Sequence, residues 1–335
     1  MKKVLVVGAG GFAGGFIVAE GLRRGYEVWA GVRSSTSREY LDDERIKFIV
    51  FDFDKPQTLA STIRETLPEG EKWDYVVYNL GATKVVRYLD FNRINYEYLR
   101  DFTNALKLTE KVPEKFLYMS SLSAMGPKDE KHYTPLTEEM IPTPNTRYGA
   151  SKLKAEVYLQ STGIPYIIFR ATGIYGPRDK DYFLMFESIK KGFDFSVGFR
   201  KQMLTFIYVE DLARAIYDAL ERSATGEIYN ISEPRAYTQA EFRKISAREI
   251  GKKVVVPVRV PVAGLKLVSW IAEKIGMIRM KPSTLNSDKY HIMKQRNWNV
   301  DISKARKGFG FDPRVSLEEG VGISVKWYKD AGWLK

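Results

Sequence analysis

The residues with the clearest chemical potential are Tyr148 and Lys152, which stand four positions apart in the segment Tyr148-Gly149-Ala150-Ser151-Lys152. Residues four apart share one face of a helix, so the phenol and the ammonium are expected to project into one site. A cation beside a phenol favours the phenolate and lowers the tyrosine pKa from about 10 toward a working pH. The pair therefore predicts acid/base chemistry, although the same spacing also occurs on ordinary solvated helices.

A glycine-rich loop lies near the N-terminus, where Gly8, Gly11 and Gly14 follow the spacing G-x-x-G-x-x-G. The loop comes directly after an apolar run and opens a segment of helical pattern. Glycines permit a tight turn and a close backbone approach, and the following helix N-terminus offers unpaired N–H groups to a pyrophosphate. The setting predicts a dinucleotide site, and the alternative is a flexible N-terminal turn.

The elements that must position these residues alternate along the first half of the chain. Continuous apolar runs separated by helical segments are typical of a parallel sheet covered on both faces. The fold class predicted is therefore α/β, with a doubly wound parallel sheet. The expected strands are 4–7, 28–32, 46–51, 75–78, 116–119 and 166–169, and the expected helices include 16–22, 96–107 and 151–159.

After residue 176 the alternation breaks, and it returns only briefly with an expected strand at 206–209 and a helix at 211–220. We expect residues 1–176 plus 205–226 to form the dinucleotide-binding domain. Residues 177–204 plus 227–335 are expected to form a smaller α/β region that binds the substrate. The aromatic-rich stretch 182–199 suits either a less polar substrate or plain domain packing.

The composition excludes several classes of site. The chain of 335 residues has no cysteine, which excludes a disulfide framework, a thiol nucleophile and a zinc-thiolate site. Its only histidines, His132 and His291, have no ligand-spaced partner, so no metal site is predicted. The apolar run at the N-terminus is too short for a signal peptide and ends in glycines, and the expected location is cytoplasmic.

The net charge of +12 is concentrated near the C-terminus, where residues 241–335 hold 20 Lys and Arg against 9 Asp and Glu. The positive residues are dispersed among apolar ones, so a solvated basic face is expected and nucleic acid is not the predicted partner. The apolar segment 260–275 is too short for a membrane span. We expect it to be an amphipathic helix packed on the smaller domain, with attachment to a membrane surface as the alternative.

Several motifs together resemble the extended short-chain dehydrogenases/reductases, the NAD(P)-dependent epimerase/dehydratase superfamily, whose core is a Rossmann-type sheet. The resemblance covers essentially the whole chain and rests on the order and spacing of the motifs. Besides the glycine loop and the Tyr148/Lys152 pair, they are the serines within 118–127, Asp52, Asn95, the stretch FRATGIYGP at 169–177, FIYVEDLA at 206–213, and the C-terminal segments 301–305, 308–313 and 327–328.

The resemblance implies a catalytic role for three residues. Ser121 would hydrogen-bond the reacting oxygen, and Tyr148 would exchange a proton with that oxygen while hydride moves to or from the nicotinamide. Lys152 would bind the cofactor ribose and keep the tyrosine pKa low. Ser123 is implied as a further substrate contact, and Arg178 and Arg200 are candidate replacements for the diphosphate clamp of nucleotide-sugar enzymes.

The resemblance also implies the cofactor-binding residues. Asp52 would reach the adenine, although an aspartate or asparagine in this setting also serves turns and caps. The second expected strand lacks the acid that usually pairs with the ribose hydroxyls of NAD, and Arg33 at its end suits the 2′-phosphate of NADP. Arg33 could instead stack on adenine, which keeps NAD open. The full expected set is Gly8, Gly11, Phe12, Ala13, Gly14, Arg33, Asp52, Phe53, Leu80, Gly81, Ala82, Asn95, Tyr148 and Lys152.

The resulting hypothesis is an NAD(P)-dependent oxidoreductase or epimerase that acts at a secondary alcohol or ketone of a nucleotide-sugar or related hydroxylated metabolite. Leu122 and Ser123 stand where sugar dehydratases carry Asp-Glu, which argues against dehydration. One alternative is an NADPH-dependent reductase of a less polar carbonyl compound. Another is a non-catalytic nucleotide-sensing or RNA-binding relative. The resemblance further implies a homodimer formed through the helices at 95–107 and 152–159.

Overall fold

The computed structural model describes residues 1–281, 283 and 285–334. Its strands are Lys3–Val7 (β1), Glu27–Val32 (β2), Lys47–Val50 (β3), Tyr75–Tyr78 (β4), Lys115–Ser121 (β5), Tyr166–Ala171 (β6), Gly173–Tyr175 (β7), Phe193–Val197 (β8), Met203–Leu204 (β9), Phe206–Tyr208 (β10), Glu227–Ile231 (β11), Tyr237–Thr238 (β12) and Val256–Val260 (β13).

The α-helices are Phe12–Arg23 (α1), Leu59–Thr66 (α2), Leu89–Asn92 (α3), Tyr98–Leu108 (α4), Arg147–Ser161 (α5), Lys180–Lys191 (α6), Val209–Arg222 (α7), Gln239–Ile250 (α8), Val262–Ile278 (α9), Ser287–Lys294 (α10), Ser303–Phe309 (α11) and Leu317–Asp330 (α12). Two short 3₁₀ turns, Pro56–Thr58 (η1) and Leu122–Ala124 (η3), and a π-helical turn, Arg93–Glu97 (η2), complete the regular structure.

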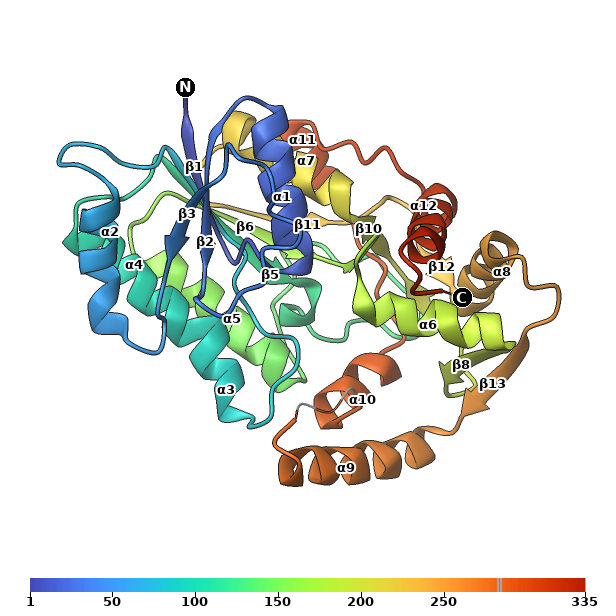
Figure 1. Cartoon of the computed structure of the whole chain (residues 1–335). Helices are drawn as coiled ribbons and strands as arrows, with labels where there is room; N and C mark the ends of the chain where they lie inside the picture. Colours follow the sequence, from blue (N-terminus) through green and yellow to red (C-terminus); the bar gives the residue numbers. More distant parts are fainter. Residues whose placement is uncertain (282, 284, 335) are drawn as a thin grey trace.

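A parallel sheet of seven strands, in the order β11-β6-β5-β4-β1-β2-β3, forms the centre of the molecule (Figure 1). The order reverses between β1 and β4, and the carboxyl ends of both strands meet at that point. In open α/β sheets this switch point is where nucleotides bind. The observed sheet confirms the predicted fold class.

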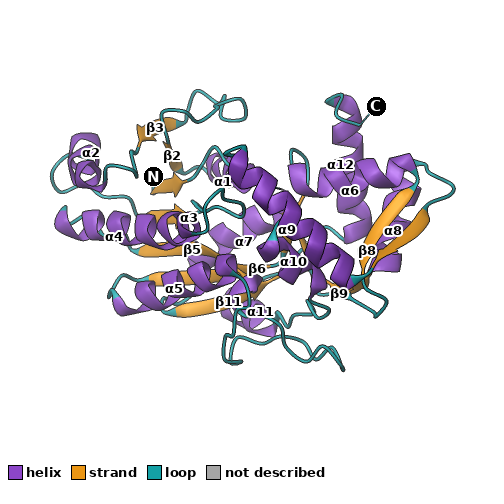
Figure 2. Ribbon diagram, turned by 90° about the horizontal axis from the view of Figure 1, so that it is seen from below, coloured by secondary structure: helices purple, strands orange, loops and turns teal. Residues whose placement is uncertain are grey.

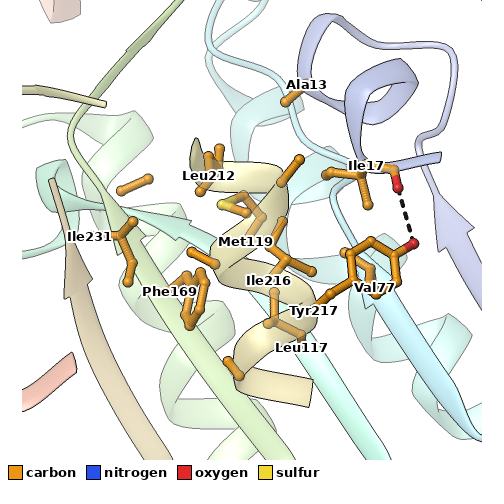
Figure 3. Packing of buried hydrophobic residues seen from close by; sticks show 14 of the residues in the cluster. Ala13, Ile17, Val77, Leu117, Met119, Phe169, Leu212, Ile216, Tyr217 and Ile231 are labelled. Carbon is orange, nitrogen blue, oxygen red and sulfur yellow. Dashed lines mark hydrogen bonds between the residues drawn. The ribbon is translucent and has the colours of Figure 1, made fainter. Parts of the chain in front are cut away.

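Both faces of the sheet are buried, which explains why its strands are continuously apolar. One face packs against α1, α7 and α11, and Figure 3 shows Ile216 and Tyr217 of α7 among the side chains of that core. The Tyr217 hydroxyl donates a hydrogen bond to the carbonyl of Ile17 at 3.0 Å, which joins α7 to α1. The opposite face packs against α2, α4 and α5 around aromatic side chains such as Phe102 and Phe116.

A separate hydrophobic cluster, away from both faces of the sheet, holds the smaller region together. It joins α6, α8 and α12 to the short parallel pair β7–β10 through residues that include Tyr175, Phe206 and Phe242. Tyr182 and Phe186, from the aromatic-rich stretch, lie inside this cluster. Domain packing therefore accounts for the first part of that stretch, whereas Phe193, Phe195 and Phe199 are exposed.

The structure corrects two expectations about the domain boundary. Strand β10 does not return to the central sheet but pairs with β7 beside it. Strand β11 was assigned to the smaller region, yet it pairs with β6 over its whole length and forms the edge of the central sheet. Residues 300–311 likewise pack in the core under α7 and β11. The boundary at residue 226 is therefore wrong, because the strand next to β6 at the edge of the central sheet is β11, which begins after that residue.

The apolar segment 260–275 forms most of α9, as the pattern predicted. None of the helices within the described residues is long and apolar enough to cross a membrane. The expected packing of α9 is only partly observed, because Leu265, Ser269 and Gly276 are buried while most of its large apolar side chains are exposed.

Candidate active site

Helix α5 carries Tyr148 and Lys152 to the carboxyl edge of the sheet. Thr146 caps the helix by accepting a hydrogen bond from the Gly149 N–H at 2.9 Å, which is a normal helix start. A second orphan donor, the N–H of Tyr148, is satisfied at 2.8 Å by Oδ2 of Asp288 from α10. The smaller region therefore fixes the first turn of the helix that carries the tyrosine.

Ser121 ends β5 and begins η3, where its hydroxyl accepts a hydrogen bond from the N–H of Ser123 at 3.2 Å. Its side chain also lies within hydrogen-bonding reach of the Tyr148 hydroxyl. The serine and the tyrosine come from the end of a strand and the start of a helix, and Ser121 lies close enough to Tyr148 to lower the pKa of its phenol. This is the arrangement expected of two groups that act on one oxygen.

The electrostatics of the pair differ from the expectation. Burial raises the pKa of Tyr148 above its usual value, and the hydrogen bond from Ser121 opposes that rise. Lys152 is 4 % exposed and its ammonium donates to the carbonyl of Met119 at 2.9 Å. Burial lowers the pKa of Lys152 to about 8. The predicted lowering of the tyrosine pKa is not observed, because desolvation of the phenolate outweighs the hydrogen bond with Ser121.

Asn95 lies in the π-helical turn η2 and is completely buried. Its side-chain oxygen accepts a hydrogen bond from the N–H of Ala82 at 2.8 Å. Its side-chain nitrogen donates to the carbonyl of Ala82 at 3.1 Å and to the Ser151 hydroxyl at 2.9 Å. Asn95 therefore joins the loop after β4 to α5, which is more than the local turn chemistry considered for it. A π-turn often marks a functional position in a helix.

The glycine loop fits a dinucleotide. A Cβ at Gly14 would collide with the Gly8 carbonyl oxygen, so this helix can approach β1 only with glycine at that position. A Cβ at Gly11 would meet only the Gly8 carbonyl oxygen, at 3.4 Å, and would fill the open space before α1. The first turn of α1 thus presents backbone N–H groups to a free volume, as pyrophosphate binding requires.

The neighbouring wall of the groove is the loop that follows β4. Leu80 and Ala82 are half-buried and Gly81 is exposed. A Cβ at Gly81 would lie 2.8 Å from the Lys152 ammonium, so only glycine at this position lets the ammonium approach the loop. A Cβ at Gly8 would lie 2.9 Å from the backbone nitrogen of Leu80, so the glycine loop lies directly against the loop that contains Gly81, and the residues present fit a bound NAD(P).

Three further expected cofactor residues follow the carboxyl ends of β2 and β3, namely Arg33, Asp52 and Phe53. Arg33 is exposed, and its charge contributes to the lowered pKa of Asp54. Asp52 accepts from the Asp54 N–H at 3.1 Å, which is the turn chemistry considered for it. The Phe53 side chain does not lie where a cofactor contact was expected. Its ring is 5 % exposed and stacks on Tyr98, so it belongs to the core.

Phe12 and Ala13, the remaining expected cofactor residues, lie in the first turn of α1. Phe12 is half-buried against the core and contacts Phe16 edge-on, and Ala13 is buried. Their backbone belongs to the helix start that faces the open volume, while their side chains pack behind it. Neither side chain is therefore placed to contact a nucleotide directly.

Two of the three expected substrate residues are placed elsewhere. The guanidinium of Arg178 lies over the rings of Phe16 and Tyr40, with its carbon 4.8 and 4.1 Å from their centroids. It therefore borders α1 and the cofactor side of the groove. Arg200 is exposed in the loop between β8 and β9. Ser123 alone lies beside Ser121, as expected.

A buried ion pair beneath the site was not predicted as such. Glu156, one turn beyond Lys152, pairs with Arg170 of β6 at 2.6 Å, and both side chains are almost fully buried. Ser120 donates a further hydrogen bond to Glu156. Arg170 lies inside the motif 169–177, but the sequence does not indicate which of the 41 acidic residues is its partner.

A charged cluster beside the loop after β4 was also missed. Lys84 forms an ion pair with Asp181 at the start of α6. Burial raises the pKa of Asp179 to about 6 and lowers the pKa of Lys289 on α10. The charges of Asp181, Lys84 and Asp179 act on Lys289, so the four groups form one cluster. These residues come from separate segments, and no local spacing indicates that they meet.

Within the described residues, no group of three or more histidine, aspartate or glutamate side chains is arranged to hold a metal ion.

These features define a class of protein, the nicotinamide-dependent enzymes built on a Rossmann-type sheet. The model of the NAD dependent epimerase/dehydratase family matches residues 4–232. The chain belongs to this family and is an enzyme of the extended short-chain dehydrogenase/reductase type. The family resemblance drawn from the motifs is thus confirmed.

The chain is similar to proteins that are named for different activities. The ceramide reductase of Caulobacter vibrioides is 23 % identical over 333 residues, which cover 99 % of this chain and 96 % of that protein. An uncharacterised UDP-glucose epimerase of Bacillus subtilis is 27 % identical, with 97 % of each protein covered. The UDP-glucose 4-epimerase of Thermus thermophilus, solved with NAD, shares the fold with a TM-score of 0.77 at 21 % identity, covering 98 % of this chain and 99 % of that one.

The lowered pKa of Lys152 makes stability depend on pH. Between pH 8 and 10.5 the unfolded chain keeps a proton on this lysine that the folded protein has lost, so stability rises with pH. We expect the unfolding free energy of wild type, minus that of Lys152→Met, to increase by roughly 3 kcal/mol across this window. Urea titrations of the cofactor-free proteins at several pH values measure it. A difference that does not vary with pH would show that the lysine titrates normally.

Proposed function

We propose that this enzyme transfers hydride between a nicotinamide cofactor and the carbon of a secondary alcohol or ketone. The observation that carries the proposal is that Ser121 lies beside Tyr148, while Lys152, one turn along the same helix, lies at Gly81 in the loop next to the glycine loop. When bound, the nicotinamide supplies or accepts the hydride. The other steps belong to the protein.

The two hydroxyls act on the substrate oxygen. Ser121 donates a hydrogen bond to that oxygen and fixes its distance from Tyr148. In reduction Tyr148 gives its proton to the oxygen as negative charge develops there, and in oxidation it takes that proton. A raised tyrosine pKa keeps the phenol protonated before reduction begins.

Lys152 binds the ribose edge of the cofactor and sets the charge beside the tyrosine. Its ammonium is held at the Met119 carbonyl and lies against Gly81. A pKa of about 8 leaves the lysine mostly protonated at neutral pH. The positive charge stabilises a phenolate formed after proton donation.

Two substrate classes remain, and different observations favour each. The similarity to UDP-glucose epimerases supports a nucleotide-sugar or related hydroxylated metabolite, and the Lys84 and Lys289 ammonium groups suit a polar or anionic part of it. The positions of Arg178 and Arg200 away from a diphosphate clamp support a less polar carbonyl compound. Similarity to a ceramide reductase over the whole chain supports this second class.

We further propose NADP as the cofactor, on the basis of Arg33 and the absence of an acid at the end of β2. The solved relatives with NAD keep NAD as the alternative. The homodimer through α4 and α5 stays a proposal, supported by the exposed Leu108 and Val157 on these helices.

The cofactor preference is testable by binding. If Arg33 contacts the 2′-phosphate, Arg33→Ser should weaken NADPH binding by about tenfold or more and leave NADH binding nearly unchanged, because one charge-assisted contact of about 1.5–3 kcal/mol is lost. Arg38→Ser is the matched control, since Arg38 lies over the Phe48 ring. Calorimetric titration of the two cofactors gives the affinities. Equal losses for NADH and NADPH would contradict the 2′-phosphate contact.

The role of Tyr148 is testable by a substitution that removes one hydroxyl. Tyr148→Phe should lower turnover by about 10²-fold or more, because the proton donor is lost. Cofactor affinity should be nearly unchanged. Steady-state kinetics with NADPH oxidation and calorimetric cofactor binding separate the two effects. Tyr158→Phe, a change of the same kind on the far end of α5, should retain turnover. Full activity of Tyr148→Phe would overturn the mechanism.

A further inference from the structure

Helix α9 presents an apolar face to solvent. Leu267, Trp270, Ile271, Ile275 and Ile278 are 59, 54, 43, 45 and 83 % exposed. Positions 267, 270, 271, 274, 275 and 278 fall on one side of a helix, opposite the buried Leu265, Ser269 and Gly276. We call the five exposed apolar residues the outer face of α9. Contiguous exposed apolar surface of this kind marks an interaction site.

The inner face of α9 is already satisfied. Leu265 packs with Val197 and Tyr290 in a small cluster that holds α9 and α10 to β8. Glu273 accepts hydrogen bonds from the N–H and the hydroxyl of Ser287 at 2.9 and 2.6 Å. Figure 1 shows α9 as the outermost element along the lower edge of the molecule, with α10 beside it. The outer face is thus held in position by the rest of the helix.

The charges in the segment that carries the outer face are mostly positive. Between residues 259 and 281 the sequence holds five basic residues, namely Arg259, Lys266, Lys274, Arg279 and Lys281. The only acid in this stretch is Glu273, whose carboxylate is directed inward to Ser287. A surface that combines large apolar side chains, a tryptophan and lysines is the composition of helices that lie in the interface of anionic bilayers.

We propose that α9 docks this enzyme on the surface of an anionic lipid bilayer through its outer face. The apolar side chains insert among the acyl chains, while the lysine stems extend along the apolar surface and keep their ammonium groups at the headgroups. The helix lies in the interface and does not span it, in agreement with its length. Membrane-surface attachment, the alternative that the sequence left open, is therefore the interpretation that the exposed side chains favour.

Docking on this face places the active site near the bilayer. Ser287 of α10 donates a hydrogen bond to Glu273 of α9. Asp288, which follows Ser287 in α10, accepts a hydrogen bond from the Tyr148 N–H. Figure 2, viewed from below, shows α9 and α10 side by side between the central sheet and the helices of the smaller region. A substrate with acyl chains could thus present a polar secondary alcohol or ketone to Tyr148 without leaving the membrane. This last step rests on the proposed function, and the docking itself does not.

The test is co-sedimentation with vesicles of phosphatidylcholine, alone or mixed with phosphatidylglycerol. Wild type should bind the mixed vesicles, and added salt should weaken that binding. Trp270→Ser/Ile271→Ser should reduce the affinity by about tenfold or more, since two apolar side chains no longer insert. Ile323→Ser on α12 is the matched control, because Ile323 is 44 % exposed. Lys266→Gln/Lys274→Gln should remove the preference for phosphatidylglycerol, and Lys326→Gln/Lys329→Gln should not.

Three results would overturn the proposal. The first is wild type that binds neither vesicle, and the second is binding that stays as tight after the Trp270→Ser/Ile271→Ser change. The third is an oligomer of the wild type, seen by light scattering in lipid-free buffer, that dissociates in the Trp270→Ser/Ile271→Ser variant. A second copy of the chain would then be the partner that covers the outer face. Turnover of a water-soluble ketone without lipid should be equal in wild type and variant. Absent turnover with intact vesicle binding would count against the proposed function alone.

Discussion

The position of α5 depends on one buried ion pair. Glu156 and Arg170 lie 2.6 Å apart, and Ser120 donates a further hydrogen bond to the carboxylate. The pair joins the middle of α5 to β6 and β5, directly under the turn that carries Lys152. Breaking such a pair on one side leaves an uncompensated charge and typically costs about 3–5 kcal/mol, so the helix cannot slide without losing it. Tyr148 and Lys152 therefore reach the sheet edge at a fixed height.

Other contacts fix the direction of this helix. Asn95 links Ser151 to the loop after β4, and Asp288 binds the first turn from the smaller region. The same helix is thus tied to the sheet, to the cofactor loop and to the substrate region. Chemistry at one carbon needs reacting groups aligned within a few tenths of an ångström, and a helix held from three sides provides that alignment.

The sequence predicts the central sheet well because its signals are local. Strands 4–7, 28–32 and 75–78 are continuous apolar runs, and the glycines at 8, 11 and 14 follow from backbone sterics that only glycine meets. Ser121, Tyr148 and Lys152 could be expected together from motif spacing. The structure places Ser121 beside Tyr148 as expected, but the direction of the Tyr148 pKa required knowledge of burial, which spacing does not contain.

The features that the sequence does not predict are long-range. Strand β11 joins β6 after a long excursion of the chain, and an apolar run does not say which edge it will complete. Phe53 was expected at the cofactor and Arg178 was a candidate replacement for a diphosphate clamp, yet their side chains turn to the core and to α1, where aromatic neighbours lie. The outer face of α9 has the same apolar pattern as a packed helix, and only the fold shows which side of it has a partner.

The central claim is that this site moves hydride between a nicotinamide and a carbon, with Tyr148 handling the proton. Mass spectrometry of the product formed in ordinary water with NADPH that carries deuterium at both C4 positions tests it most directly. The account predicts one deuterium on the carbinol carbon of the reduced product and none on its oxygen after exchange. A product whose new C–H bond carries hydrogen from solvent would contradict it.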